Sequence, residues 1–298
     1  MRSLLACSLL LALAACQPRR PALLHIDPTL ESLVPADTVF VVGANVDAIR
    51  NTTIYQKLLS RVPVPQLDEF TRRTGLESKD LSQILACSNG KNAVLMARGK
   101  FNRADLEKRL EQNGAPLFSY KNHRLFGNET QAIAFLNDST AIAGRTNELE
   151  PILDGRKTSG LPQVLRDLLR TLPQNDQIYA ALTGGLAGLN LAAPENSNLA
   201  QIIQALRSVN TATLGMDLTT GFDVIANVNC NTERDAKFVH DLLKGVIGFG
   251  RLNTPDKQPE LLKLYDAIEV TQQQTHTAVK ANVSQDLADK FLDLWLKR

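Results

Sequence analysis

The strongest apolar stretch of the chain lies at its start. Residues 4–15 are almost wholly apolar, and Arg2 is the only charged residue before Cys16. A positive start, an apolar stretch and small residues before a cleavage point are typical of a secretory signal. The stretch is about a dozen residues long, whereas a membrane-spanning helix needs roughly 20. The pattern therefore predicts a signal peptide over residues 1–15 that is removed.

The next segment, residues 16–30, lacks a regular apolar period. It contains Pro18, Pro21 and Pro28, and it predicts a semi-extended spacer. The folded part is expected to begin near Leu30.

Beyond the spacer, apolar residues recur with the two-residue period of strands or the 3.6-residue period of helices. In the first half the strands are expected at 38–42, 82–87, 93–97, 117–120, 124–126, 132–136 and 141–143, and the helices at 46–60, 66–73, 102–110 and 148–153. Asn89-Gly90 lies between two apolar runs and predicts a hairpin turn. Asn102 is expected to cap the helix that follows it, with Asp105 at the third helical position.

The second half repeats this order. Its strands are expected at 177–182, 211–218, 222–228, 268–273 and 278–283, and its helices at 199–206, from a Thr232 cap to about residue 246, and from Ser284 onward. Gly245, Gly248 and Gly250 predict that the helix after Thr232 ends in a loop.

The repeated order predicts an α+β fold made of two similar halves. The stretch 132–142 resembles 267–279, and each is followed by an expected helix. Each half is expected to be an antiparallel sheet with hairpins packed against helices, related to the other by a pseudo-symmetric duplication. Hairpins argue against a doubly wound parallel sheet. The halves are expected at 31–156 and 157–298, with a joint in residues 155–162.

The four residues Leu13-Ala14-Ala15-Cys16 resemble the bacterial lipobox. This resemblance implies lipidation of the Cys16 thiol, cleavage before Cys16 and acylation of the new amino end. Two or three acyl chains suffice for stable attachment to a membrane. The alternative is an ordinary signal that happens to contain a cysteine. Gln17 rather than Asp follows Cys16, which, by similarity to enterobacterial sorting, favours the outer membrane over the inner one.

The start of the mature chain also resembles uncharacterised bacterial envelope proteins that open with an LVPADT-like strand. Residues 33–38, 45–50 and 54–58 carry this resemblance, which departs where Ile54 stands in place of a proline before Tyr55. The family has no established activity, so the resemblance implies no catalytic residues.

Composition excludes some classes of partner. Loss of Arg2 with the signal leaves 32 basic against 31 acidic residues, which gives no reason to expect nucleic acid. Aromatic residues make up 5% of the chain, which disfavours a carbohydrate site built by stacking. Cys7 leaves with the signal. Cys87 and Cys230 either form a disulfide in an oxidising periplasm or remain two buried thiols.

No motif for catalysis, cofactor binding or metal binding stands out. The glycine-rich loop 184–188 follows a strand, but it lacks the pattern and the lysine of a phosphate-binding loop. No histidine pairs with another His or Cys at metal spacing, and all four are interpreted as surface residues: His25, His123, His240 and His276. There is also no G-x-S-x-G or H-E-x-x-H motif. We therefore predict no catalytic, cofactor or metal residues.

The last helix carries one apolar stripe, formed by Leu287, Phe291, Leu294 and Trp295. It is expected to face the core, with a membrane or a partner as the alternatives.

Three functional hypotheses remain. The first is a membrane-anchored envelope lipoprotein without enzymatic activity that binds a protein partner or supports an envelope assembly. The second is a carrier of a lipid or another apolar ligand. The third is an unrecognised hydrolase, whose catalytic groups would come from distant positions without a local motif.

Overall fold

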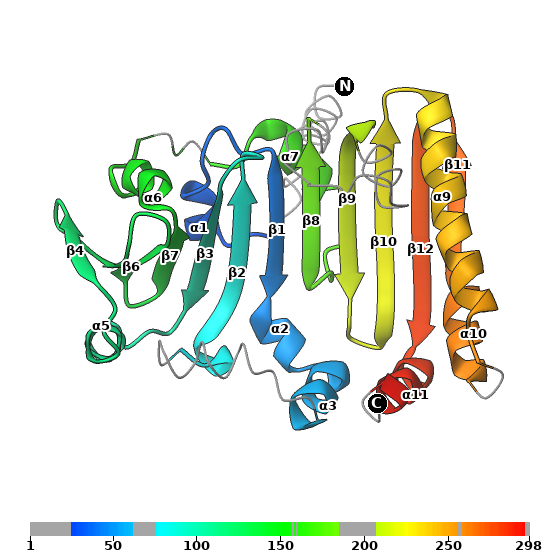
Figure 1. Ribbon diagram of the computed structural model, residues 1–298, viewed down its shortest axis with the longest axis horizontal. Coiled ribbons are helices and arrows are strands. Elements are labelled where there is room, and N and C mark those ends of the chain that lie inside the picture. The colour runs from blue at the N-terminus through cyan, green and yellow to red at the C-terminus, as the bar shows by residue number, and fades with distance from the viewer. Residues whose placement is uncertain are drawn as a thin grey trace, which may run out of the picture.

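The protein folds around one large, curved, antiparallel sheet. The computed structural model describes residues 25–61, 76–156, 158, 160–184, 207–255 and 258–295. These residues form a sheet of twelve strands in the order β11-β12-β10-β9-β8-β1-β2-β3-β7-β6-β5-β4 (Figure 1). All neighbouring strands pair in the antiparallel sense. The predicted α+β class with antiparallel hairpins is thereby confirmed.

The first half supplies seven strands at one end of the sheet. Its described elements are α1 (Pro28–Ser32), β1 (Phe40–Asn45), α2 (Val46–Arg50), α3 (Thr53–Arg61), the 3-10 turn η1 (Ser78–Asp80), β2 (Leu81–Ser88), β3 (Ala93–Gly99), α5 (Arg103–Gln112), β4 (Leu117–Tyr120), β5 (His123–Gly127), β6 (Ala132–Asn137), β7 (Thr140–Gly144) and α6 (Thr146–Leu153).

The second half supplies the other five strands. Its described elements are α7 (Gln163–Leu169), β8 (Ile178–Thr183), β9 (Val209–Asp217), β10 (Gly221–Cys230), α9 (Glu233–Leu252), α10 (Pro259–Asp266), β11 (Ile268–Gln273), β12 (His276–Ser284) and α11 (Gln285–Trp295).

The two halves share the sheet through the pairing of β1 with β8. Phe40 lies opposite Leu182, and Ala44 lies opposite Ile178. The antiparallel strands of the two halves therefore form one continuous sheet. Joining the two sheets removes two unpaired strand edges, which would otherwise expose backbone N–H and C=O groups. Outward from this junction the strand order is β1-β2-β3-β7-β6 on one side and β8-β9-β10-β12-β11 on the other.

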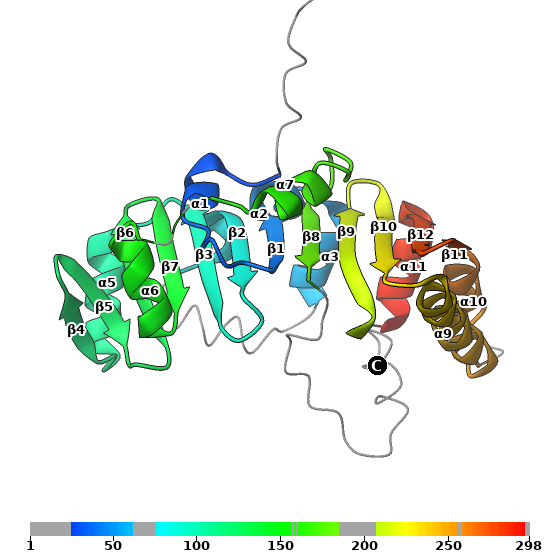
Figure 2. The same ribbon diagram turned by 90° about the horizontal axis from the view of Figure 1, so that it is seen from above.

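The main core lies on the convex face of the sheet, where α1 and α7 cover the central strands (Figure 2). Leu30 from α1, Leu149 from α6 and Leu165 from α7 are fully buried against strand residues such as Val41 and Leu85. Side chains from both halves thus fill one continuous core. The opposite face carries α9 and α11 towards one end of the sheet.

The predicted hairpins and helix caps are confirmed. Gly90 has a φ of 89° in the turn between β2 and β3, a conformation that glycine adopts without strain. The Asn102 side chain accepts a hydrogen bond from the Asp105 N–H. The stretches 132–142 and 267–279, which resemble each other in sequence, correspond to the β6–β7 and β11–β12 hairpins, and α6 and α11 follow them.

Two helix boundaries differ from expectation. The single helix predicted over 46–60 is two helices, because the Thr52 side chain accepts a hydrogen bond from the Tyr55 N–H and starts a new one. The helix after Thr232 continues to Leu252 and contains all three of its glycines, so the predicted loop is wrong. Gly250 allows the ring of Tyr265 in α10 to pack closely, and this contact supports the end of α9.

The body also begins earlier than predicted. Ile26 is buried and α1 starts at Pro28, within the stretch that we expected to belong to the spacer. The helices α1, α7 and α10 were not predicted. The predicted helices 66–73 and 199–206, the signal peptide, Cys16 and residues 185–188 lie outside the described residues.

Candidate functional site

The two cysteines of the body are free thiols in separate parts of the core. Cys87 lies in β2 within the central core, and Cys230 ends β10 within a second cluster beneath α9. Burial raises the pKa of the Cys87 thiol to about 12 and also raises that of Cys230. Both thiols are therefore protonated at neutral pH and poorly nucleophilic.

The four histidines do not come together. His123 begins β5, and His276 begins β12. His240 lies on α9, where its Nδ1 is 2.9 Å from the Asp241 carboxylate. Within the described ranges, no three His, Cys, Asp or Glu side chains converge in a way that would hold a metal ion. Nor does any helix there have the length and apolar character needed to cross a membrane.

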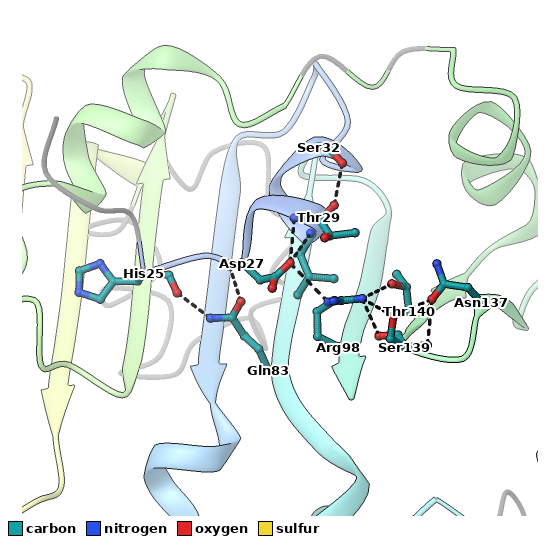
Figure 3. Close-up of polar contacts among 10 residues, drawn as sticks. His25, Asp27, Thr29, Ser32, Gln83, Arg98, Asn137, Ser139 and Thr140 are labelled. Atoms are coloured by element: carbon teal, nitrogen blue, oxygen red, sulfur yellow. Dashed lines mark hydrogen bonds and ion pairs between the residues drawn. The ribbon is translucent and has the colours of Figure 1, made fainter. Parts of the chain in front are cut away.

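His25 marks the place where the chain enters the body (Figure 3). Its Nε2 is 2.6 Å from the carbonyl oxygen of Pro173, and its ring packs against the Tyr179 ring at a tilt of 42°, with centroids 5.1 Å apart. The Gln83 side chain donates to the His25 carbonyl at 2.6 Å and accepts from the Asp27 N–H at 2.5 Å. One amide side chain of β2 thereby holds the backbone on both sides of Ile26.

We call residues 25–27 the entry segment. Asp27 fastens this segment to the first half. Its carboxylate caps α1 by accepting from the Thr29 N–H at 2.8 Å, and it lies 3.4 Å from the Arg98 Nε. Arg98 also donates to the Ser139 and Thr140 hydroxyls at 2.6 and 2.7 Å (Figure 3). The network joins the entry segment, β3 and the β6–β7 turn.

An exposed apolar row runs along α9. We call it the α9 row, and its members are Phe238, Leu242, Gly245, Phe249 and Leu252. Phe249 is 71% exposed and Leu252 is 86% exposed, whereas Leu242 is half-buried. Successive members are four and three residues apart, the spacing of a seam that packs against another helix. A Cβ added at Gly245 would meet nothing within 4 Å, so the backbone is open there.

Local sequence explains why α9 forms in this position. The Thr232 hydroxyl accepts from the Asp235 N–H at 3.2 Å, and acidic residues in the first turn favour the helix dipole. On the inner face Ala236 and Val239 are buried with Leu182 and Val209. The inner face therefore fixes the helix on the sheet and turns the α9 row to solvent.

A line of two lysines, with Asp241 between them, borders the α9 row. Lys237 and Lys244 each precede a row member and lie seven residues apart. In the part of the chain that the structure describes, neither lysine forms an ion pair. Arg251 continues the line but pairs with Asp266 of α10. The two lysines are thus available to a charged partner.

A groove of about 990 Å³ lies on the sheet surface near α5. Its floor is a cross-strand row of Ala86, Leu95, Ala143 and Ile133, which are directly opposite one another in β2, β3, β7 and β6. Small residues in this row leave room above it, and Leu95 remains 45% exposed. Arg145 lies at the rim and is exposed.

Comparison with known proteins gives a likeness of fold. No family model matches the chain, and no curated protein matches it in sequence. The fold is similar to that of TP0453, a Treponema protein. Crystal form III of that protein has a TM-score of 0.51 at 9% identity, over 92% of this chain and 99% of the other. Crystal forms I and IV give TM-scores of 0.46 and 0.49 at 8% and 9% identity, each over 90% of this chain and over 98% and 97% of theirs.

The sequence contains the spacing of the α9 row. Apolar residues at helical spacing most often face the core, which predicts a core position for Leu242, Leu243 and Val246. Leu242 and Leu243 do pack against the core, whereas Val246 is exposed. The α9 row therefore contacts the core at Leu242 and is exposed at Phe238, Phe249 and Leu252.

Proposed function

We propose that the protein is a lipid-anchored protein of the cell envelope, without enzymatic activity, that binds a protein partner through the α9 row. The lipobox-like residues before Cys16 support the anchor, and Gln17 favours the outer membrane. The observation that carries the proposal is the exposure of Phe249 and Leu252 in a row with helical spacing. Contiguous apolar surface of this kind commonly marks a site of interaction.

The chemistry of α9 favours an acidic amphipathic helix as the partner. The row repeats every seven residues, which matches the seam of a second helix. Lys237 and Lys244 border the row on one side and would face acidic side chains flanking the partner's seam. The open backbone at Gly245 permits a large partner side chain to sit at the centre of the row.

A protein helix fits this surface better than a lipid surface. The row repeats every seven residues as the seam of a helix pair does, whereas helices that lie in a membrane interface bury a broad apolar face. Asp241 lies on the helix beside the row, and the first turn carries Glu233 and Asp235. These carboxylates give the exposed side of α9 a mixed charge, whereas anionic lipid headgroups attract basic segments.

Site-specific cross-linking in cells tests the partner. A photo-reactive residue at Lys244 should form a protein adduct that Phe249→Glu abolishes. The matched control is Val164→Glu, because Val164 is 52% exposed on α7 at the other face of the sheet and should leave the adduct unchanged. Charge reversal at Lys237 should weaken the adduct. An adduct with lipid alone, or one that survives Phe249→Glu, would contradict the proposal.

The anchor has its own test. Replacement of Cys16 by Ser should release the mature protein from the membrane fraction and remove fatty acid from its mass. If the variant still fractionates with membranes, the anchor is not at Cys16.

A second candidate function rests on the groove near α5. Its apolar floor and volume of about 990 Å³ suit a lipid or another apolar ligand, and the exposed Arg145 at the rim suits an anionic group on it. Native mass spectrometry after mild extraction should detect a co-purified ligand. Ala143→Trp, which fills the floor, should remove that ligand, whereas the distant Val164→Trp should not. A protein that carries no ligand in either form would exclude this function.

We also infer that the two halves arose by duplication of one unit. The matching strand orders on the two sides of the β1–β8 pair support this, as does the resemblance between stretches 132–142 and 267–279. Sequences of relatives should align half against half in the register that pairs β1 with β8. Absence of such an alignment in more slowly diverging relatives would contradict the inference.

A further inference from the structure

The end of α7 borders a second, smaller groove on the convex face of the sheet. We call it the α7 groove; it has a volume of about 280 Å³ and shares no lining residue with the groove near α5. Leu168 and Thr171 at the end of α7 form one wall, and β9, β10 and β12 form the floor. The floor consists of hydroxyls, carboxamides and one imidazole, which come from Thr211, Thr213, Asn227, Asn229 and His276.

The same face of the first half is built differently. The strands at the matching places in the order are β2, β3 and β7, and their side chains Leu85, Met96 and Ile142 are buried in the core with residues of α1, α6 and α7. In the second half these positions of the sheet hold hydrogen-bonding groups instead. The α7 groove therefore contributes little to the apolar core.

The α7 groove also differs from the solvated part of its own face. Further along β10 and β12, Asp223, Lys280 and Asn282 are exposed, as expected for the outer face of an antiparallel sheet. In the groove, Thr213 is only 5% exposed, and Asn227 is half-buried. Its polar groups are thus partly withdrawn from water.

A chain of hydrogen bonds fixes the state of His276. The Asn229 Nδ2 donates to the Thr211 hydroxyl at 3.3 Å, so the Asn229 Oδ1, 3.2 Å from the His276 Nδ1, accepts from that nitrogen. In the neutral imidazole the Nε2 is then an acceptor. The Asn227 Nδ2 donates to the Thr213 hydroxyl at 3.4 Å. Contacts of this length are weak, so these groups retain capacity for a ligand.

We propose that the α7 groove binds an N-acetylated sugar unit. A sugar hydroxyl donates to the His276 Nε2, and the carboxamide of Asn227 exchanges hydrogen bonds with the acetamido group. The threonine hydroxyls serve the remaining ring substituents, and Leu168 contacts the carbon atoms of the ring. This site does not depend on the partner proposed for α9.

Charge and size favour this class of ligand. No carboxylate, ammonium or guanidinium group occurs among the described residues that line the groove, and withdrawing an uncompensated charge from water is costly. A volume of about 280 Å³ lies just below the range of pockets for drug-sized molecules, which suits one sugar ring. Recognition rests on hydrogen bonds rather than on stacking, in keeping with an aromatic content of 5%.

Nuclear magnetic resonance of the whole mature chain with Cys16→Ser tests the site. In the free protein the His276 imidazole should carry its proton on Nδ1. Addition of N-acetylglucosamine should shift the Asn227 carboxamide and the His276 Nε2 signals saturably, with a Kd in about the millimolar range. Glucosamine, whose ammonium group would lose water in the groove, should leave both signals unchanged.

A matched pair of variants separates the groove from the rest of the face. Asn227→Leu keeps the size of the side chain but removes its hydrogen bonds, and it should weaken binding by about tenfold or more. Asn282→Leu changes an exposed asparagine of β12 on the same face and should bind like the unmodified protein. Backbone amide spectra of both variants report that the sheet is intact.

Three results would overturn the proposal. They are the absence of a saturable shift with N-acetylglucosamine, equal binding by Asn227→Leu and the unmodified protein, and a His276 proton on Nε2 in the free protein. A trimer of N-acetylglucosamine distinguishes the source of the sugar. Tighter binding of the trimer than of the single sugar would indicate a glycan chain, and equal binding would indicate a single unit; both results support the site.

Discussion

At the scale of single residues, small side chains in the central strands decide which large ones can be buried. Gly43 and Gly215 flank Tyr179 across β1, β8 and β9, and Tyr179 is fully buried between them. A side chain at either glycine would compete for the space that the ring and the Asp176 carboxyl occupy. The small residues of the sheet thus leave room for Tyr179, against which the His25 ring of the entry segment packs.

Gly43→Ala should lower the free energy of unfolding by about 1–3 kcal/mol, because the added methyl overlaps a ring that has no room to move. Urea denaturation measures this change. Gly245→Ala is the matched control, since its methyl meets open space within α9 and should raise stability by up to about 1 kcal/mol. Equal stability of Gly43→Ala and the unmodified protein would show that Tyr179 adapts.

The Asp154 carboxylate should make stability depend on pH in the acid range. The Lys121 ammonium holds the pKa of Asp154 below its ordinary value of 3.8. The Tyr120 hydroxyl and the Arg156 guanidinium also lower this pKa. A lowered pKa in the folded state contributes stability that is present above about pH 4 and is lost as pH falls below it.

Asp154→Asn should therefore flatten the dependence of the unfolding free energy on pH below about 4. Denaturation at a series of pH values measures it, with the exposed Asp167→Asn in α7 as the control. If the unfolding free energy of Asp154→Asn depended on pH as steeply as that of the unmodified protein, the contacts of Asp154 would be equally strong whether its carboxyl is protonated or not.

At the scale of elements, α9 depends on its first turn as well as on the sheet beneath it. Its amino end is capped by Thr232, and its carboxyl end is held by Tyr265 against Gly250 and by the pair of Arg251 with Asp266. Three glycines lower its intrinsic helix propensity by roughly 1 kcal/mol each relative to alanine. Tertiary contacts and the cap offset this cost.

Thr232→Ala should destabilise α9 by about 1 kcal/mol, because the Asp235 N–H loses its acceptor. Faster amide exchange in the first turns of α9 would report the change, while β8 should be unaffected. Thr232→Ser, which keeps the hydroxyl, should restore the original protection. Loss of protection with Ser as well would indicate that the methyl group, rather than the cap, matters.

At the scale of the whole molecule, the β1–β8 junction makes the two halves one cooperative unit. Leu85 and Leu149 from the first half share a core with Leu165 and Tyr179 from the second. Neither half retains a complete core if the other unfolds. The expected behaviour is a single transition rather than the two transitions of independent domains.

The two buried thiols allow this to be measured. In a mature chain with Cys16→Ser, Cys87 reports the first half and Cys230 reports the second. Both should become reactive towards a thiol reagent at the same urea concentration. Midpoints that differ beyond experimental error would show that the halves unfold separately.

Local patterns in the sequence were sufficient for the strands, hairpins and caps. These features depend only on residues a few positions apart, so a short stretch of sequence contains everything that determines them. They are the alternating apolar residues of the strands, the Asn89-Gly90 turn, and the caps at Asn102 and Thr232. The same local pattern did not disclose α1, α7 or α10, which are five to eight residues long. Helices this short depend on packing for their stability.

The sequence by itself determined the antiparallel α+β class, because turn residues and two-residue periodicity specify hairpins without reference to distant positions. Only the tertiary structure decided that β1 pairs with β8, that His25 meets the Pro173 carbonyl, and that Phe249 and Leu252 of the α9 row face solvent. Each of these depends on contacts between residues far apart in the chain. Periodicity shows that a residue faces one side of its element, whereas the neighbour on that side is set by how the elements pack.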